Sequence, residues 1–381
     1  MPVSTSSDPI TVGPALAEAA LIPILAPGAR PECIKNQSIA LTAGATAFSN
    51  LPFSLKFIND NQAEARTQMV RAFVFPGQGS QAVGMGQRLA EASPVAREVF
   101  EEVDEALGQR LTRLMFEGPQ EELTLTANAQ PALMAVSVAL VRTLERDGGK
   151  RLADVARYVA GHSLGEYSAL AAAGALSLSD TARLLRLRGE AMQAAVPVGE
   201  GAMAALLGLE IPAVEEIVAA ASAVGVCAIA NDNTPGQIVV SGSAAAVLRA
   251  TELAKEKGAR RAIMLDVSAP FHCSLLQPAA DAMLAALADI RLDEPVVSLI
   301  ANVTAAPVTD PEEIRRLLVE QVTATVRWRE CVLAMKELGV DTLVEMGGGK
   351  VLTGMVRRID REMTGVSVEG PDEIEALLGT L

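Results

Sequence analysis

Residues Gly161 to Gly165 form the pattern Gly-x-Ser-x-Gly, with a serine between two glycines. The pattern follows an apolar stretch typical of a β-strand and precedes a stretch with helical periodicity. Glycines at both ends allow the sharp strand–helix turn called a nucleophile elbow, which exposes the serine oxygen beside a helix N-terminus. We therefore predict that Ser163 is a nucleophile. The alternative is a structural turn in which the serine caps a helix.

A serine hydroxyl needs a base, and the chain has only two histidines, His162 and His272. His162 is adjacent to Ser163, and consecutive side chains diverge at such a turn. We therefore predict His272 as the base, although a single histidine between Phe271 and Cys273 is also typical of a buried core histidine. Cys273 is a rival nucleophile, but a free cysteine is more often a small buried apolar residue.

A second glycine-rich turn, residues 75–80 (Phe-Pro-Gly-Gln-Gly-Ser), also lies between a predicted strand and a predicted helix. It lacks the Lys-Ser/Thr pair of a phosphate-binding loop. Its backbone N–H groups can instead face an oxyanion, which needs two donors. We predict the N–H of Leu164, directly after the nucleophile, as one donor and the N–H of Gln78 as the other. A purely structural turn is the alternative.

Composition excludes several other classes of protein. The 381 residues are 50% apolar but only 3% aromatic, so the core must be aliphatic. A net charge of −14 argues against a nucleic-acid partner, because neutralising phosphates requires an excess of Lys and Arg. Four dispersed cysteines and two histidines exclude a disulfide scaffold and a Cys- or His-rich metal site, so we expect no metal. No apolar run reaches about 18 residues, so we expect no membrane partner and a cytoplasmic location.

Residues 1–68 differ from the rest of the chain. They are rich in Pro, Ser, Thr and Ala and have neither helical nor strand periodicity. They lack the basic start of a signal peptide and the arginines of a transit peptide. We expect a disordered N-terminal extension or an upstream-start artefact, with Met69 as a possible initiator. A short docked helix near residues 15–25 is the alternative.

From Arg71 onward, predicted strands alternate with predicted helices, which favours an α/β fold with a mainly parallel sheet and helices on both faces. Residues 199–266 follow the order β-α-β-β-α-β, with a turn at residues 231–236, which is typical of a ferredoxin-like unit. We therefore expect a hydrolase-like α/β body of residues 69–198 and 267–381 with an inserted ferredoxin-like subdomain. A last amphipathic helix is expected after the turn at residues 347–350. The other predicted body elements are strands at 71–75, 156–160, 297–300 and 342–345 and helices at 131–145, 164–173, 179–195, 275–287, 311–320 and 328–337.

Several motifs, in order along the chain, resemble the malonyl-CoA:acyl carrier protein transacylases of bacterial fatty acid synthesis. The motifs are residues 75–81 (Phe-Pro-Gly-Gln-Gly-Ser-Gln), 161–169 (Gly-His-Ser-Leu-Gly-Glu-Tyr-Ser-Ala), 188–189 (Arg-Gly), 231–237 (Asn-Asp-Asn-Thr-Pro-Gly-Gln), 270–273 (Pro-Phe-His-Cys) and 349–352 (Gly-Lys-Val-Leu). The resemblance extends from Arg71 to the C-terminus and leaves residues 1–68 outside. It implies the same α/β body with a ferredoxin-like insert.

The resemblance also implies a role for each candidate residue. Ser163 attacks the malonyl thioester of CoA, and His272 takes the serine proton and then protonates the leaving thiolate. The backbone N–H groups of Gln78 and Leu164 hold the oxyanion, and the backbone carbonyl of Gln321 orients the histidine. The residues implied in substrate binding are Arg188, His162, Asn231 and Met192.

A chemical argument supports Arg188 independently. A malonyl group carries a permanent negative charge, and a bidentate arginine fits a carboxylate. The alternative is a solvated helix charge, because Arg183 and Arg186 lie nearby. Two features depart from the family pattern: Gly348 replaces a proline found in many members, and the N-terminal extension of residues 1–68 is not a usual feature. Leu164 and Phe271 resemble malonyl-preferring members of the family over methylmalonyl-preferring ones.

The predicted function is therefore malonyl transfer from malonyl-CoA to the phosphopantetheine thiol of acyl carrier protein, by a monomer that needs no cofactor. A fatty acid carrier and a polyketide carrier both fit. The alternative enzyme is a serine thioesterase or hydrolase, which would need an Asp or Glu beside His272. A catalytically silent carrier-docking protein is a third hypothesis, and the intact Ser163 and His272 argue against it.

Overall fold

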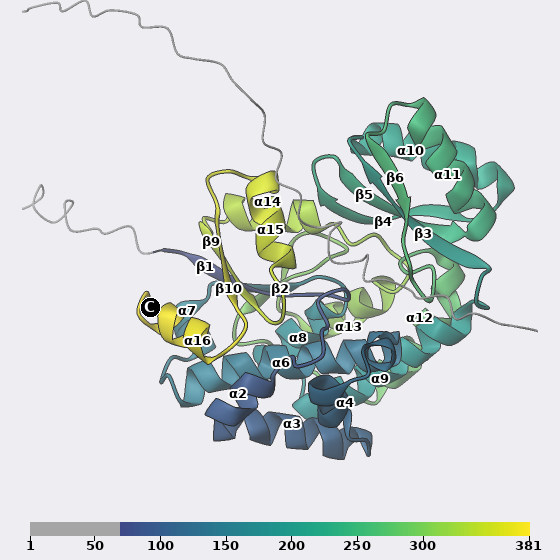
Figure 1. The fold of residues 1–381 in the computed structure, drawn as a ribbon. Coiled ribbons are helices and arrows are strands. Elements are labelled where there is room, and N and C mark those ends of the chain that lie inside the picture. Colours follow the sequence, from purple (N-terminus) through teal and green to yellow (C-terminus); the bar gives the residue numbers. More distant parts are fainter. Residues whose placement is uncertain (1–68) are drawn as a thin grey trace, which may run out of the picture. The chain divides into compact units, whose positions relative to one another are not determined.

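The computed structural model describes residues 69–381, so the expectations for residues 1–68 lie outside the described range. A six-stranded sheet runs through the larger part of this range in the order β10-β9-β1-β2-β7-β8 (Figure 1). Every neighbouring pair is parallel except β7 with β8, so the expected mainly parallel α/β fold is observed. The strands are β1 Arg71–Phe75, β2 Tyr158–Gly161, β7 Ser298–Ile300, β8 Pro307–Val308, β9 Thr342–Met346 and β10 Thr364–Val368.

Side chains of β1 alternate between the two faces of this sheet, as the two-residue period of a strand requires. Phe73 and Phe75 pack with the larger set of helices, whereas Ala72 and Val74 pack with Trp328 and its neighbours on the other face. The larger set comprises α2 Gln87–Ala92, α3 Pro94–Leu107, α4 Leu111–Glu117, α5 Gln120–Thr124, α6 Thr126–Arg146, α7 Leu152–Val155, α8 Gly165–Ala172, α9 Leu178–Ala195, α12 Gln277–Ala288, α13 Pro311–Glu320 and α16 Pro371–Leu378. The other face is covered by α14 Trp328–Glu337 and α15 Val351–Ile359.

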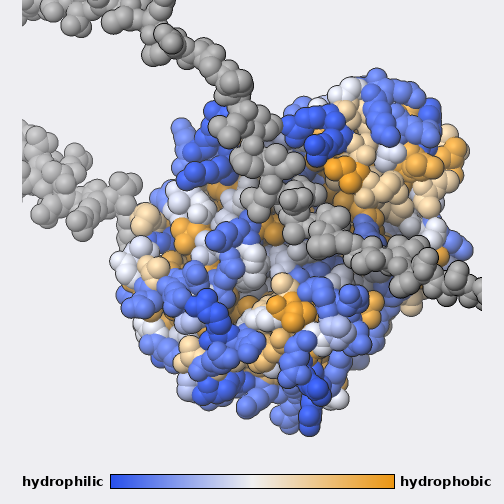
Figure 2. Space-filling view, in the orientation of Figure 1, coloured by the Kyte–Doolittle hydropathy of each residue, from blue (hydrophilic) through white to orange (hydrophobic). Residues whose placement is uncertain are grey.

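A second, four-stranded sheet lies between residues 201 and 264, and all its pairs are antiparallel in the order β4-β5-β3-β6. Its elements are β3 Gly201–Leu207, α10 Ile211–Ala221, the short 3₁₀ helix η2 Ser222–Val224, β4 Cys227–Thr234, β5 Gln237–Ser243, α11 Ala244–Glu256 and β6 Arg261–Met264, and η3 Ser274–Leu276 follows. Helices α10 and α11 share an apolar core with this sheet. Apolar residues also gather on the surface beside them, whereas hydrophilic residues dominate over α2 to α4 (Figure 2).

Three details differ from the sequence-based expectations. Strand β4 runs on to Thr234, because two irregularities in its pairing with β5 let residues of the expected turn stay in the sheet; only Pro235 and Gly236 turn. Helix α6 begins at Thr126, before Pro131, and its first turn packs against α9. Helix α15 is not the last element, because β10 and α16 follow it.

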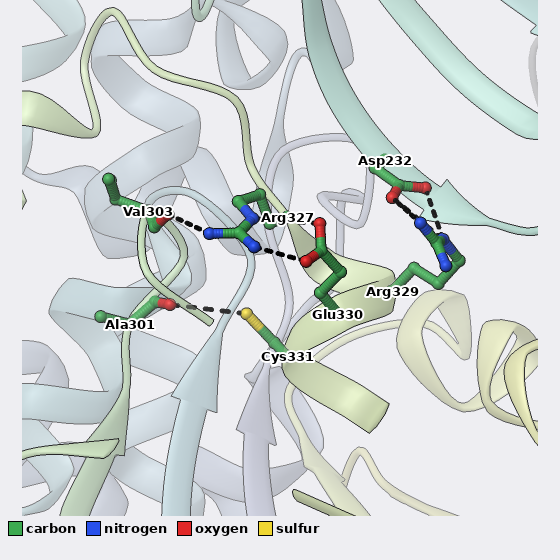
Figure 3. Close-up of polar contacts among 7 residues, drawn as sticks. All are labelled: Asp232, Ala301, Val303, Arg327, Arg329, Glu330 and Cys331. Atoms are coloured by element: carbon green, nitrogen blue, oxygen red, sulfur yellow. Dashed lines mark hydrogen bonds and ion pairs between the residues drawn. The ribbon is translucent and has the colours of Figure 1, made fainter. Parts of the chain in front are cut away.

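The second sheet is attached to the body along one edge of β4. Asp232 N donates to Val326 O (3.0 Å), and Val326 N donates to Ala230 O (2.9 Å). The Arg329 guanidinium binds the Asp232 carboxylate through Nε (2.9 and 3.0 Å) and Nη2 (2.7 Å), as Figure 3 shows. The Asp232 side chain is only 4% exposed, so this charge depends on its partner. These contacts fix β4 beside α14.

Gly189 allows helices α6 and α9 to cross closely. A Cβ at this position would lie 2.6 Å from Ala127 Cα and 2.8 Å from Ala127 N, which is closer than van der Waals contact allows. The clashing atoms belong to backbone and cannot rotate away. This close crossing brings Arg188, the preceding residue, against Gln130 of α6.

We expect Gly189→Ala to destabilise the fold by about 1–3 kcal/mol, because α6 and α9 must separate. Gly354→Ala is the matched control: this glycine also lies inside a helix, but its added Cβ would meet nothing within 4 Å. The control should be neutral or gain up to about 1 kcal/mol from helix propensity. Urea unfolding of both variants measures the difference, and equal midpoints would contradict the proposed clash.

No helix between Met69 and Leu381 combines the length and the apolar character needed to cross a bilayer.

Candidate active site

Ser163 lies in the predicted turn between β2 and α8, with φ at 53°, a left-handed conformation that is strained for serine. Glycine is required at both flanking positions because backbone atoms of neighbouring segments lie too close for a Cβ atom. A Cβ on Gly161 would lie 1.8 Å from the carbonyl carbon of Gly165, and one on Gly165 would lie 2.2 Å from Phe75 O. The Asn302 side chain supports the turn by accepting from Ser163 N (2.9 Å) and donating to Gly161 O (2.7 Å). The half-buried serine is thereby held at the carboxyl end of the parallel sheet.

His272 lies next to Ser163, although the two residues are far apart in sequence. Its Nε2 is 2.8 Å from Ser163 Oγ, and its Nδ1 is 2.9 Å from the backbone carbonyl oxygen of Gln321. A carbonyl can only accept, so Nδ1 carries the proton and Nε2 has a free lone pair for the serine hydroxyl. Burial, together with the positive charge of Arg188, lowers the pKa of His272 to about 3. The imidazole is therefore neutral at physiological pH and can accept a proton.

Arg188 is a buried cation, 1% exposed, that contacts neutral partners. Its Nη1 donates to Gln130 Oε1 (2.7 Å), and its Nη2 donates to Gln321 Oε1 (2.9 Å) and to Ser163 Oγ (3.1 Å). The guanidinium also lies over the Tyr167 ring, 5.6 Å from its centroid. Between Met69 and Leu381 no carboxylate forms an ion pair with it, and its Nε has no hydrogen-bond partner. The solvated-charge alternative is therefore wrong, and an incoming anion would find an unpaired cation.

The two predicted oxyanion donors follow adjacent parallel strands. Gln78 comes after β1 and Leu164 after β2, and these strands pair through Phe75 and Gly161. A Cβ on Gly77 would lie 2.7 Å from His162 O, so the first turn fits closely against the second. Neither the N–H of Gln78 nor that of Leu164 donates a hydrogen bond within residues 69–381. Both donors are thus available to a ligand.

The other predicted site residues lie at different distances from this centre. His162 Nε2 is 2.9 Å from Asn233 Oδ1, and burial lowers the pKa of His162. Met192 lies beside Gln130, a hydrogen-bond partner of Arg188: its sulfur is 3.8 Å from Gln130 Nε2. Asn231 is buried on β4, where its backbone bridges to Val326. Asn233 is thus the residue of the second sheet whose side chain contacts the elbow.

The rival nucleophile Cys273 is fully buried. Its Sγ donates to Pro270 O (3.2 Å), and burial raises the pKa of the Cys273 thiol. The thiol therefore stays protonated, which makes it a poor nucleophile compared with Ser163.

Sequence reasoning missed three residues that hold this centre together. Gln130 is a buried amide on the mainly apolar buried face of helix α6, and Asn302 lies two residues past the end of β7 at Ile300. Glu166 lies within the serine motif and is 2% exposed. A polar residue inside an apolar helix, or just past the carboxyl end of a parallel strand, was the available signal in each case.

The groups around Ser163 together can carry out acyl transfer chemistry. A serine oxygen faces a neutral imidazole, two free N–H groups lie beside it, and a guanidinium without a carboxylate partner lies within hydrogen-bond distance. These are the parts needed to attack a carbonyl, to stabilise the resulting oxyanion and to hold an acid group of the substrate.

Comparison with known proteins identifies the family. The family described as "Acyl transferase domain" matches residues 72–371. The malonyl CoA-acyl carrier protein transacylase of Bacillus subtilis is 46% identical over 311 residues, covering 81% of this chain and 96% of that protein. The crystal structure of acyl-carrier-protein-S-malonyltransferase from Bartonella henselae is 57% identical, covers 82% of this chain and 100% of that chain, and has a TM-score of 0.80.

A further similar structure is that of a malonyl-transacylase in complex with its type II polyketide synthase acyl carrier protein. It is 41% identical, covers 82% of this chain and 100% of that chain, and has a TM-score of 0.79. The chain therefore belongs to the malonyl CoA-acyl carrier protein transacylase family and is an acyltransferase.

Proposed function

We propose that this enzyme transfers the malonyl group of malonyl-CoA to the phosphopantetheine thiol of an acyl carrier protein through a malonyl ester of Ser163. One observation carries the proposal: Ser163 Oγ lies 2.8 Å from His272 Nε2 and 3.1 Å from Arg188 Nη2. The serine thus has a base on one side and a cation, suited to the malonyl carboxylate, on the other.

The reaction has two balanced half-reactions. His272 Nε2 takes the Ser163 proton while Oγ forms a bond to the thioester carbonyl carbon. The carbon–sulfur bond then breaks, and the CoA thiolate leaves with the proton from His272. In the second half, His272 takes the proton of the phosphopantetheine thiol, the sulfur attacks the malonyl ester, and Ser163 Oγ leaves with that proton.

Each tetrahedral intermediate carries a negative oxygen. The N–H groups of Gln78 and Leu164 are the proposed donors to it, and removal of one such donor typically slows a reaction by about 10²–10³-fold. The Gln321 carbonyl keeps the proton of His272 on Nδ1. The hydrolase alternative is not favoured, because a carbonyl and not a carboxylate lies 2.9 Å from this nitrogen.

The malonyl carboxylate is proposed to bind Arg188. Taking this guanidinium out of water is costly unless an anion or well-placed acceptors replace the water. The residues proposed to line the same binding region are His162, Met192 and Asn231; the contact of Met192 with Gln130, a partner of Arg188, supports this.

We further propose a hydrolase-like body of residues 69–198 and 267–381 and a ferredoxin-like subdomain of residues 199–266, supported by the strand order β6-β3-β5-β4. The enzyme acts as a monomer in the cytoplasm. It needs no metal or cofactor, because Ser163 and His272 provide the nucleophile and the base themselves.

Unpaired arginines near the second sheet suggest where the acidic carrier binds. Arg358 Nη1 donates to Gln237 Oε1 (3.0 Å), Gln237 pairs with Leu207, and Leu207 pairs with Arg261. Basic residues of α15 and of the second sheet therefore meet at one place. We call the group of Arg260, Arg261, Arg357 and Arg358 the arginine patch; none of its members forms an ion pair within residues 69–381. By contrast, Arg183 is paired with Asp180.

Ser163→Ala should abolish the malonyl-enzyme and therefore transfer to the carrier. The matched control is Ser168→Ala, which removes a buried hydroxyl inside α8 and should leave transfer intact. Radiolabelled malonyl-CoA is incubated with each protein, followed by phosphopantetheinylated carrier or water. Label on the carrier is expected; label on the alanine variant of Ser163, or release only as free malonate, would contradict the proposed function.

The lowered pKa of His272 makes a specific pH prediction. The base is neutral above about pH 3, so phosphonylation of Ser163 by a fluorophosphonate should have a constant rate between about pH 5 and 7. An unperturbed histidine would lose activity below about 6.5. In the unfolded chain this histidine binds a proton below about pH 6.5, whereas in the folded protein it does so only below about pH 3. The free energy of unfolding should therefore also fall as the pH is lowered from about 6.5 toward 3. A rate midpoint near 6.5 would show that burial does not control the base.

Reversing Arg261 and Arg357 to Glu should raise the KM for carrier protein several-fold and change the KM for malonyl-CoA much less. The double reversal of Arg113, exposed on α4, and Arg151, exposed just before α7, is the charge-matched control. The defect should shrink with salt, because such charges are screened over about 8 Å at physiological ionic strength. If the two double variants have equal carrier KM values, the arginine patch is not the docking surface.

A further inference from the structure

Glu166 is a buried carboxylate that the proposed mechanism does not use. It lies in the first turn of α8 and is 2% exposed. Its Oε1 accepts from the backbone N–H of Asn302 (2.8 Å), and its Oε2 accepts from the side-chain amide of Gln321. It has no ion pair within residues 69–381. Both oxygens therefore face N–H donors, an arrangement that suits the ionised form.

This carboxylate is one of the groups that face the Gln321 amide. Gln321 Nε2 faces three acceptors, namely Glu166 Oε2, Ser163 O (3.0 Å) and Asn302 Oδ1 (3.3 Å). Its Oε1 is thereby turned toward Arg188 Nη2 (2.9 Å). A flipped amide would place NH₂ against the guanidinium and would leave a carbonyl oxygen facing a carboxylate. Of the three acceptors, only Glu166 can carry a charge, which it does above about pH 8.

We propose that Glu166 is a positioning residue for acyl-group selection: by holding the Gln321 amide in one orientation, it keeps the Arg188 guanidinium fixed beside Ser163 Oγ, where it receives the substrate carboxylate. The inference rests on the proposed function and adds a residue that never touches the substrate. Its effect should be confined to acyl groups that need Arg188, because the Gln321 carbonyl that orients His272 belongs to the backbone and does not move when the amide flips.

The protonation of Glu166 gives this role a pH signature. Burial raises the pKa of Glu166 to about 8, while hydrogen bonds from Asn302 and Gln321 and the charge of Arg188 act in the opposite direction. Protonation would turn one acceptor oxygen into a donor facing N–H groups. The ionisable groups around it do not titrate between pH 6.5 and 9: the pKa of His272 is lowered to about 3, that of Tyr167 is raised to about 12, burial raises that of Cys331, and Arg188 stays charged.

The test is the ratio of kcat/KM for malonyl-CoA to kcat/KM for acetyl-CoA, measured at pH 9 and pH 6.5. In Glu166→Gln one acceptor becomes an NH₂ group, and the ratio at pH 9 should fall about tenfold, mainly through malonyl-CoA. At pH 6.5 the difference from the wild type should shrink, because the wild-type carboxyl is then protonated too. Glu166→Asp retains two acceptor oxygens and should recover part of the ratio.

Glu345→Gln is the matched control. Glu345 is equally buried, and its carboxylate accepts from Leu352 N (3.0 Å) and Thr353 N (2.8 Å) at the start of α15, away from Gln321. The Glu345→Gln variant should have a lower melting temperature and an unchanged ratio of kcat/KM for malonyl-CoA to kcat/KM for acetyl-CoA. If the wild-type enzyme transfers malonyl but Glu166→Gln keeps the wild-type ratio at pH 9, the inference is overturned and the proposed function is not. The same conclusion follows if the ratio of Glu166→Gln changes with pH as the wild-type ratio does. A wild-type enzyme that transfers no malonyl would instead overturn the proposed function.

Discussion

The structure of this site depends on one buried guanidinium. Burying an unpaired cation typically costs several kcal/mol, and here the loss of water around Arg188 is offset by oxygens of Gln130, Gln321 and Ser163 and by the Tyr167 ring. All of these partners are neutral, so positive charge remains available. The same charge helps to lower the pKa of His272. A single buried residue thus leaves a positive charge beside Ser163 and, together with burial, keeps the His272 imidazole unprotonated.

Backbone proximity places the serine within reach of that charge. The turns after β1 and β2 touch each other only because residues 77, 161 and 165 lack side chains. The close crossing at Gly189 brings Arg188 against Gln130, and Arg188 Nη2 lies 3.1 Å from Ser163 Oγ. Ser163 and Arg188 are therefore brought together by two close backbone contacts that leave no room for a Cβ atom. One is the packing of the two turns, and the other is the crossing of α6 and α9.

The second sheet contributes a side-chain contact to the site, through Asn233, and none of the residues proposed to react with the substrate. Strand β4 is held to the body by Asp232 and Arg329, and its Asn233 side chain contacts His162. His272 follows the last strand of that sheet and adopts a left-handed φ of 59° where the chain returns to the body. The geometry of the base therefore depends on how the two sheets are joined.

The sequence alone determined the elements and the principal chemistry. The serine turn, the single available base and the alternation of strands and helices follow from short-range patterns, and strand β1 was predicted with its exact bounds. Only tertiary structure decided which polar residues complete the site. Glu166, Asn302 and Gln130 come from separate segments, and their roles depend on hydrogen bonds that no local periodicity encodes. Likewise, residues 231–234 remain in a strand because they pair with β5, and Asn231 also bridges to Val326 of the body, although their composition is typical of a turn.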